Sequence, residues 1–450
     1  MSDFSFTQEQ LRELAADVLR HAERCGASAC ETDVSEGVGQ SVTVRKGEVE
    51  TIEFNRDKGV GVSVYLGQRR GHASTSDFSP ASLRATVEAA LSIARFTAED
   101  EAAGLPEPEL LATREQGNMD LDLYHPWNLP VEEAIDLARR SEQAAFAVSP
   151  LVRNSEGATV SAHSAHFISA NSLGFMGGFP SSRHFISCVP IAGKGSDMQR
   201  DDWYSGWRDP AELAAPEVIG EYAARRALSR LGAKKLKTRQ CPVMFEAPLA
   251  AMLLGSFVHA VSGGSLYRKA SFLVDSLGKK IFPDWMHIEE RPHIKRGLAS
   301  SPFDDDGVGT RDRTVVADGV LQGYFLSTYT ARKLGMQTTG NAGGSHNLIV
   351  APSPDAPPDF AGLLKQFGTG LLVTELLGHG INYVTGDYSR GAAGYWVNKG
   401  EIAWPVHEIT IAGNLRDMFA GIAAIGRDTV TRGSRSVGSI VVNRMTVAGS

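Results

Sequence analysis

The sequence predicts an α+β fold: two small N-terminal α/β units, each a helix, an antiparallel meander and a second helix, followed by a β-rich C-terminal domain. The chain has 450 residues, enough for two to four domains at roughly 100–200 residues each. Its 47 glycines among 450 residues are a larger share than the usual one of about 7%, which indicates many tight turns. Helical and alternating segments also follow one another in the same order twice, which suggests a weak duplication.

The first unit is expected to begin with a helix. Residues 7–10 form a capping-box pattern, and apolar residues then recur at helical spacing until Gly26. Alternating valines follow, separated by a Lys46-Gly47 turn and a second turn at residues 57–59, and this alternation predicts an antiparallel meander. A second helix is expected after Ser79-Pro80, because proline is favoured in the first helical turn.

The second unit repeats this order after a connection. Residues 97–129 are acidic and rich in proline, which indicates an extended linker. A helix is expected from Pro130, a glycine-rich β stretch over 151–207, and another helix ending near Leu231.

The C-terminal domain is expected to be β-rich. Residues 243–245 predict a buried strand and residues 247–260 a helix. The pair Asp318-Gly319 between two alternating runs predicts a hairpin, since Asp-Gly favours the tight turns that join antiparallel strands. Further strands are expected at 320–326, 383–385, 395–397 and 409–411, with a turn at 398–400. We therefore place the domains at 1–125, 126–238 and 239–450.

Composition excludes several classes of protein. The 45 Lys and Arg residues against 52 Asp and Glu residues leave a net charge of −7, unlike the basic surface of a nucleic-acid-binding protein. The four cysteines (Cys25, Cys30, Cys188 and Cys241) have no Cys-x-x-Cys spacing, which favours reduced thiols. No signal-peptide pattern or membrane-length apolar run is found, so we expect a cytoplasmic protein without a membrane partner.

Common catalytic motifs are missing from the sequence. There is no P-loop, no complete Gly-x-Gly-x-x-Gly fingerprint and no Gly-x-Ser-x-Gly nucleophile elbow. The single His-Glu pair, His407-Glu408, is followed by Ile411 and Ala412 where a zinc peptidase needs a second histidine. We interpret this pair as part of a strand.

Three local patterns are candidates for chemistry. His163 and His166 should point to opposite faces of a strand and therefore not converge. Residues 304–306 are consecutive aspartates without the spacing of a calcium loop, which favours an acidic turn.

The third pattern is a group of a carboxylate, an imidazole and a second carboxylate. Glu375 and His379 would share a face if their segment were helical, and Asp387 follows. The group could serve acid–base catalysis, although a structural hydrogen-bonded set is the favoured interpretation.

Several longer blocks carry a family resemblance. They lie at residues 49–55, 77–80, 263–269, 272–278, 283–285, 368–375, 385–394 and 408–414. On these blocks, which cover nearly the whole chain, the sequence resembles the TldD/PmbA family of peptidase-complex proteins, and within it the PmbA branch, also called TldE.

The resemblance implies a metallopeptidase complex but a chain without the metal. The TldD branch carries a His-Glu-x-x-x-His helix and a late cysteine, and the aligned positions here are Gly255, Ser256 and Ala260. We therefore expect no catalytic, metal-ligating or cofactor-binding residue in this chain, and a zinc or iron ion in a TldD-type partner. The family is understood to digest unfolded or modified peptides as a TldD–TldE heterodimer, in peptide-antibiotic maturation and antitoxin degradation, and is linked to DNA gyrase modulation.

Two alternatives remain open at this point. The chain could be a self-sufficient hydrolase that uses Glu375, His379 and Asp387, or it could be a homodimeric peptide-binding scaffold. A homodimer is also possible for the isolated chain even if the heterodimer is its working state.

Overall fold

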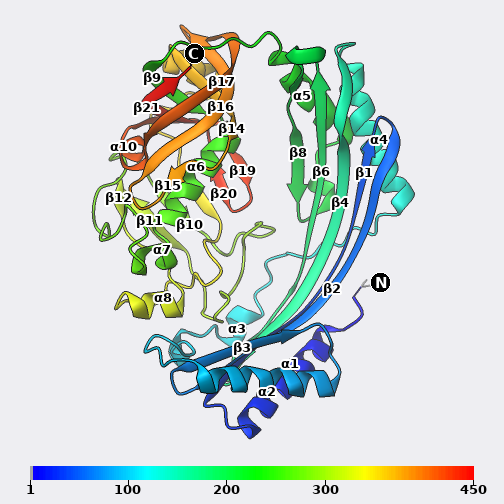
Figure 1. Cartoon of the computed structure of the whole chain (residues 1–450), viewed down its shortest axis with the longest axis vertical. Coiled ribbons are helices and arrows are strands. Elements are labelled where there is room, and N and C mark those ends of the chain that lie inside the picture. The colour runs from blue at the N-terminus through cyan, green and yellow to red at the C-terminus, as the bar shows by residue number, and fades with distance from the viewer. Residues whose placement is uncertain (1–3, 450) are drawn as a thin grey trace. The chain divides into compact units, whose positions relative to one another are not determined.

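A computed structural model describes residues 4–449 (Figure 1). The chain divides into two compact units. The first comprises the residues up to Leu228 together with His293–Thr310, and the second comprises Ser229–Pro292 and Arg311 onward. The fold is α+β, as the sequence predicts, with helices and long strands in the first unit and a β-rich second unit.

The first unit contains one large antiparallel sheet. Its helices and short 3-10 turns are α1 (Gln8–Arg24), α2 (Pro80–Phe96), η1 (Pro108–Leu110), α3 (Arg114–Gly117), α4 (Val131–Ala147), η2 (Gly195–Asp197), η3 (Pro210–Glu212) and α5 (Pro216–Ser229). Its strands are β1 (Ala29–Arg45), β2 (Glu48–Leu66), β3 (Arg69–Thr75), β4 (Val152–Asn171), β5 (Met176–Gly177), β6 (Pro180–Ala192), β7 (Gln199–Arg200) and β8 (Trp203–Trp207).

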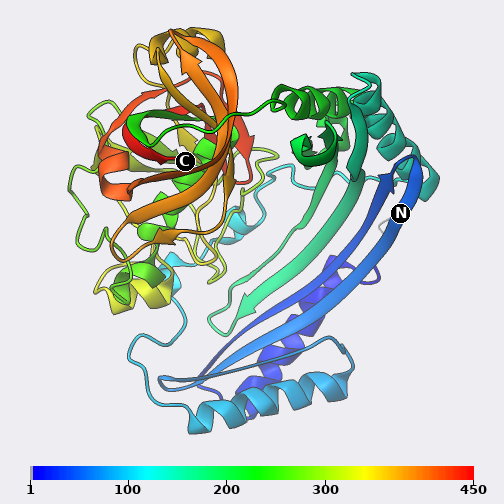
Figure 2. The same cartoon turned by 45° about the horizontal axis from the view of Figure 1, so that its top comes forward.

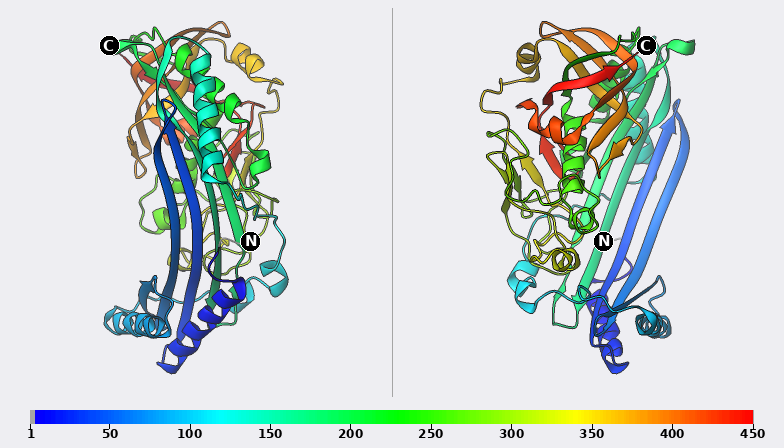
Figure 3. Two further views of the ribbon diagram at one scale, coloured as in Figure 1. Left: turned by 90° about the vertical axis from the view of Figure 1, so that its right-hand side faces the viewer. Right: turned by 60° about the vertical axis from the view of Figure 1, so that its left-hand side comes forward.

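The two predicted α/β units share this sheet. Its strand order is β3-β2-β1-β4-β6-β7, with β5 beside β4 and β8 beside β6. Strand β1 of the first repeat pairs with β4 of the second over fourteen residue pairs from Glu31–Asn171 to Val44–Ala158. Figure 2 shows the length and curvature of β1, β2, β4 and β6. Helices α1 and α2 contact strands of this sheet, as α4 does along β4 (Figure 3, left).

Local sequence signals account for the helix starts. Thr7 and Gln10 form the expected capping box at α1, Ser79 caps α2 through the Ser82 N–H, and Pro130 precedes α4. These predictions are confirmed. Such helix starts can be read from the sequence because capping depends on residues within one turn of the helix end.

The first meander differs from the prediction. Lys46-Gly47 is a tight turn, with positive φ values of 53° and 77°. The predicted turn at residues 57–59 is wrong, since β2 runs through it and Gly59 pairs with Ser35. The first half of β2 is exposed on both faces, so its sequence lacks the apolar alternation that marks a strand.

The second unit contains two sheets and a central helix. Its helices are α6 (Ala247–Ala260), α7 (Gly263–Tyr267), α8 (Thr328–Lys333), α9 (Phe360–Phe367) and α10 (Leu415–Ala420). Its strands are β9 (Arg239–Phe245), β10 (Ile288–Glu290), β11 (Arg313–Ala317), β12 (Val320–Leu321), β13 (Leu348–Val350), β14 (Gly370–Leu377), β15 (Ile381–Asn382), β16 (Asp387–Asn398), β17 (Glu401–Asn414), β18 (Ile422–Ile425), β19 (Val430–Arg432), β20 (Arg435–Val437) and β21 (Ile440–Ala448).

One of these sheets closes on itself. Strands β14, β9, β21, β17 and β16 pair in this order, and β16 pairs again with β14. The other sheet has the order β12-β11-β10-β13-β20-β19. Helix α6 contacts strands of both sheets, β9 and β14 in one and β19 and β20 in the other (Figure 3, right). Closure leaves the sheet with few free edges.

Predictions for the second unit are mostly confirmed, with two corrections. The helix at 247–260 and the turns at 318–319 and 398–400 lie where expected. Residues 383–385 form a turn between β15 and β16, so the predicted strand is wrong. Strand β12 ends at Leu321, well before the predicted residue 326. Among the described residues, no helix is long and apolar enough to cross a membrane.

Candidate functional site

Helix α6 carries the positions at which the family resemblance expects metal ligands. The helix follows Glu246, has Pro248 in its first turn and ends at Ala260. It is apolar on nearly every face, and Phe257 and Leu254 are among the most completely buried side chains of the protein. A helix of this composition belongs in a core, so any site on α6 rests on a rigid support.

The three aligned residues do not fit a metal ion. Gly255 and Ala260 have no side-chain donor atom. The buried Ser256 hydroxyl accepts a hydrogen bond from the Tyr383 hydroxyl at 3.5 Å. The Ala260 carbonyl accepts one from the Ser271 hydroxyl at 2.5 Å. Zinc and iron need several nitrogen, sulfur or carboxylate ligands, and this part of α6 offers a single hydroxyl.

An arginine occupies the space beside Gly255. A β-carbon on Gly255 would lie 3.2, 3.3 and 3.5 Å from Nη1, Cζ and Nη2 of Arg435 in β20. The absence of a side chain at Gly255 therefore allows the guanidinium to lie against the helix. Arg435 is partly buried. Burial lowers its pKa, and the nearby Tyr383 hydroxyl opposes this effect, but a guanidinium stays charged in proteins.

Two arginines, Arg435 and Arg268, bring positive charge to this part of α6. The His259 ring lies 4.0 Å from the Tyr383 ring, measured between centroids. Burial lowers the pKa of His259, and the positive charge of Arg268 lowers it further. A metal cation placed here would meet the charge of Arg435 at short range, where Coulomb repulsion is strong.

The described chain offers no alternative metal centre. Among residues 4–449, no group of three or more His, Cys, Asp or Glu side chains is arranged to hold a metal ion. All four cysteines are free thiols. Burial raises the pKa of Cys30 and of Cys188 to about 12, so neither presents the thiolate that metals and nucleophilic reactions require.

Glu375, His379 and Asp387 do not form a group. Glu375 lies in strand β14 rather than in a helix, so the condition for a shared face with His379 is not met. The Glu375 carboxylate forms an ion pair with Arg230, and His379 lies exposed in the loop after the strand.

Asp387 is tied into a turn instead. Its carboxylate accepts hydrogen bonds from the Thr385 hydroxyl at 2.6 Å and the Asn414 amide at 3.2 Å, and these bonds hold its pKa below the usual range. None of the hydrogen bonds or ion pairs among described residues joins two members of the predicted group.

The other candidate patterns are structural. His166 lies buried, with Nε2 3.3 Å from a Glu36 carboxylate oxygen, whereas the His163 ring lies over Gly39, so the two histidines do not converge. The carboxylate of Asp304 accepts backbone N–H groups of Asp306 and Val308 at 3.0 and 2.9 Å, as expected of an acidic turn.

His407 and Glu408 also behave as predicted. Both lie in β17, and Glu408 forms an ion pair with Lys235 at 2.9 Å. The pair therefore belongs to a strand and provides no peptidase motif.

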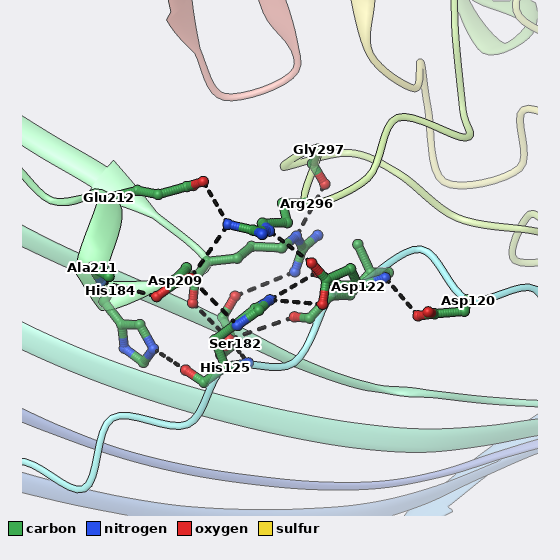
Figure 4. Close-up of polar contacts among 12 residues, drawn as sticks. Asp120, Asp122, His125, Ser182, His184, Asp209, Ala211, Glu212, Arg296 and Gly297 are labelled. Carbon is green, nitrogen blue, oxygen red and sulfur yellow. Dashed lines mark hydrogen bonds and ion pairs between the residues drawn. The ribbon is translucent and has the colours of Figure 1, made fainter.

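Sequence reasoning missed an ion-pair network in the first unit (Figure 4). Arg296 donates to Asp122 at 2.7 Å and to Glu212 at 2.8 Å, and lies 3.4 Å from Asp209. His125 lies between Asp122 and Asp209, at 3.1 and 3.6 Å. A histidine between carboxylates can do acid–base chemistry, but here the Arg296 guanidinium occupies the centre of the group.

The network fastens segment 293–310 to the first unit. Asp122 and Arg296 both have left-handed backbones, with φ of 54° and 59°, a conformation that persists in such residues when surrounding contacts fix it. Arg296 holds the pKa of Asp122 below its usual range. The two residues are 174 positions apart, so no local pattern could have indicated the contact.

The first unit also has a cavity of about 510 Å³ beside its sheet. Its lining includes Phe54, Arg56, Trp127 and His184. His184 donates through Nε2 to the His125 carbonyl, 2.8 Å away (Figure 4), and its buried Nδ1 has no hydrogen-bond partner among the described residues.

Comparison with known proteins defines the class. Models of the PmbA/TldA metallopeptidase family match the chain in order: domain 1 at residues 30–94, the central domain at 124–231 and the C-terminal domain at 238–449. The chain therefore belongs to this metallopeptidase family.

Curated relatives identify the branch. The Metalloprotease PmbA of Escherichia coli O157:H7 is 47% identical over 423 residues, covering 94% of this chain and 93% of the relative. The PmbA homolog of Haemophilus influenzae is 44% identical, with 98% and 97% covered. The TldD homolog of the same species is 23% identical, with 86% and 83% covered. The chain is a member of the PmbA branch, as the sequence analysis expected.

Solved structures share the fold. A Bacteroides thetaiotaomicron protein described as a candidate modulator of DNA gyrase has a TM-score of 0.91 at 26% identity, covering 99% of this chain and 100% of that one. TldE from Thermococcus kodakarensis has a TM-score of 0.82 at 18% identity, with 97% and 100% covered. The second likeness concerns the fold alone.

Proposed function

We propose that this chain is the non-catalytic subunit of a heterodimeric metallopeptidase, in which a TldD-type sister subunit holds the zinc or iron ion. The single observation that carries the proposal is the contact between Arg435 and Gly255. It places a positive charge on α6 at the position where the catalytic branch is expected to have its first histidine. Loss of one ligand could be compensated elsewhere, but here donor atoms are missing and a cation takes their space.

The substrates in this proposal are unfolded or modified peptides. The relatives named Metalloprotease PmbA support peptide substrates, and the occurrence of TldE and TldD proteins among the similar chains supports a two-subunit complex. We retain the division at about residues 125 and 238, which the three family-model matches support. We also retain a cytoplasmic location, where the four free thiols would stay reduced.

A free strand edge could help to hold an extended peptide. Strand β3 pairs with β2 only from Val60 to Leu66. Residues 48–58 of β2 are exposed, and they include Ile52 and Phe54, which are 43% and 66% exposed. An extended peptide can bind by adding a strand to such an edge, because backbone hydrogen bonds tolerate many sequences.

The test is to purify the chain alone, the TldD-type sister alone and the two together. Elemental analysis would measure bound metal, and cleavage of a flexible peptide would measure activity. We expect metal to follow the sister, cleavage to require the sister, and a chelator to abolish it. One tightly bound metal per chain, or chelator-sensitive cleavage by this chain alone, would contradict the proposal.

A variant pair addresses the hydrolase alternative. In Glu375→Gln and His379→Ala, the rate of cleavage per folded, assembled complex should equal that of the wild type. Abolished turnover in a normally assembled variant would instead support a site at these residues.

A further inference from the structure

Arg435 has no counter-ion among the described residues of the second unit. It forms no ion pair with any described residue, and its buried Nε has no hydrogen-bond partner. Charged groups that are partly removed from water are normally paired, because desolvation without a partner is costly. A second arginine, Arg268, acts on the nearby His259 and contacts the Tyr267 hydroxyl at 3.3 Å, and it likewise forms no ion pair with a described residue.

The geometry leaves the hydrogen-bonding edge of Arg435 available. Nη1, Cζ and Nη2 lie at nearly equal distances from the position of a β-carbon on Gly255, namely 3.2, 3.3 and 3.5 Å. The flat face of the guanidinium therefore rests on α6, and its N–H groups point along the helix surface rather than into it. Two parallel N–H groups match the two oxygens of a carboxylate.

Neighbouring groups can add further contacts to a carboxylate. Tyr383 connects the positions, with its hydroxyl 3.5 Å from Ser256 Oγ and its ring on His259. A tyrosine and a serine hydroxyl can each donate a hydrogen bond to an oxygen anion. The arrangement provides a cation and two hydroxyls, but no acid, on a helix fixed in the core.

We propose that Arg435 binds a carboxylate of an extended peptide, supplied either by the peptide's C-terminus or by an Asp or Glu side chain, at the α6 position that the catalytic branch uses for its metal. The inference rests on the proposed function only in taking a peptide as the ligand. The same helix position would then hold a metal in the catalytic branch and bind the substrate by charge in this chain.

The test compares three versions of one flexible, fluorescently labelled peptide in binding to the isolated chain. The first version has a free C-terminal carboxylate, the second is amidated, and the third is amidated with one internal Glu. We expect at least one carboxylate-bearing version to bind about tenfold to a hundredfold more tightly than the plain amidated one, as charge-assisted hydrogen bonds predict. The version that gains affinity identifies the source of the carboxylate.

Substitutions connect this preference to the site. Arg435→Gln should abolish it, whereas Arg435→Lys should retain a smaller preference, because lysine keeps the charge but loses the paired N–H groups. The matched control is Arg239→Gln, which removes an arginine that stacks on Trp396 in the same unit, 4.9 Å from the ring centroid. This control should keep the wild-type preference. Circular dichroism would verify the folding of each variant.

Several results would overturn the inference. Equal binding of all three peptides, no binding of any of them, or an unchanged preference in folded Arg435→Gln would each do so. Competition by inorganic phosphate or acetate without any preference among the peptides would show an anion site with no role in peptide binding. Equal binding of the peptides would contradict this inference but not the proposed function. A metal ion bound to the isolated chain would contradict the proposed function but would not change the outcome of the peptide-binding test.

Discussion

Two arginines of the second unit have opposite surroundings. Arg313 in β11 donates through Nε to the buried Glu290 carboxylate at 2.5 Å and through Nη1 to the Tyr324 carbonyl at 2.7 Å. Among the described residues, Arg435 in β20 has neither a carboxylate nor a carbonyl partner, and it rests on Gly255.

The carboxylate beside Arg313 is also well satisfied. Glu290 accepts hydrogen bonds from the Asn341 amide at 2.8 Å and the His346 backbone N–H at 2.7 Å. Where a buried guanidinium serves structure, this fold gives it a carboxylate and a carbonyl partner, although the buried Nη2 of Arg313 has no hydrogen-bond partner among the described residues. An unpaired one on the same scaffold is therefore better explained by a ligand than by packing.

The largest effect is expected for Glu290→Ala. The change leaves Arg313 buried without its counter-ion, which typically costs about 3–5 kcal/mol of unfolding free energy. Urea unfolding of the isolated chain would measure it. The neighbouring Glu289→Ala, at a side chain that is 42% exposed, is the control and should change little. A loss below about 1 kcal/mol for Glu290→Ala would remove the contrast with Arg435.

A smaller effect is expected for Arg296→Ala in the first unit, where the network of Figure 4 is partly exposed. Exposed ion pairs are weak and are screened by salt. Because Arg296 lowers the pKa of Asp122, the stabilisation is present above the usual carboxyl range and is lost as pH falls through the lowered pKa.

The measurement is unfolding free energy against pH. Wild type should lose more stability than Arg296→Ala as the pH falls below about 4, and the difference between them should shrink in high salt. Parallel pH curves for the two proteins would mean that the network does not stabilise the fold.

Arg435→Gln should change stability by less than about 1 kcal/mol, since it removes a charge that has no partner to lose. An arginine is therefore expected to matter for stability at position 313 and for binding at position 435. Thermal and urea unfolding would check it. A loss of about 3 kcal/mol or more would show that Arg435 is a structural residue.

The smallest effect is expected for His379→Ala. The side chain lies exposed in a loop, and surface substitutions of this kind usually stay within about 0.5 kcal/mol. Neither stability nor cleavage by the reconstituted complex should change measurably. A large change in either would indicate a partner for His379 in the assembled complex.

Much of the fold could be predicted where neighbouring residues decide the structure. The capping box at Thr7, the start of α2 at Ser79, helix α6 and the Asp318-Gly319 turn all depend on contacts within a few residues. The order helix, meander, helix was likewise visible twice. What local patterns could not show is that both meanders join through β1 and β4 in one sheet, because strand pairing depends on distant residues.

The candidate site divides in the same way. The sequence alone shows that Gly255 and Ala260 have no side-chain donor atom for a metal, and that Ser256 offers only a hydroxyl. The folded structure was needed to see that Glu375 and His379 do not share a helix face, that Tyr383 lies in a turn beside α6, and that Arg435 occupies the space over Gly255. Arg435 lies 180 residues after Gly255 in the sequence. The physical reason is that an unpaired charge is defined by everything packed around it, and the chain assembles those neighbours from segments that are remote from one another.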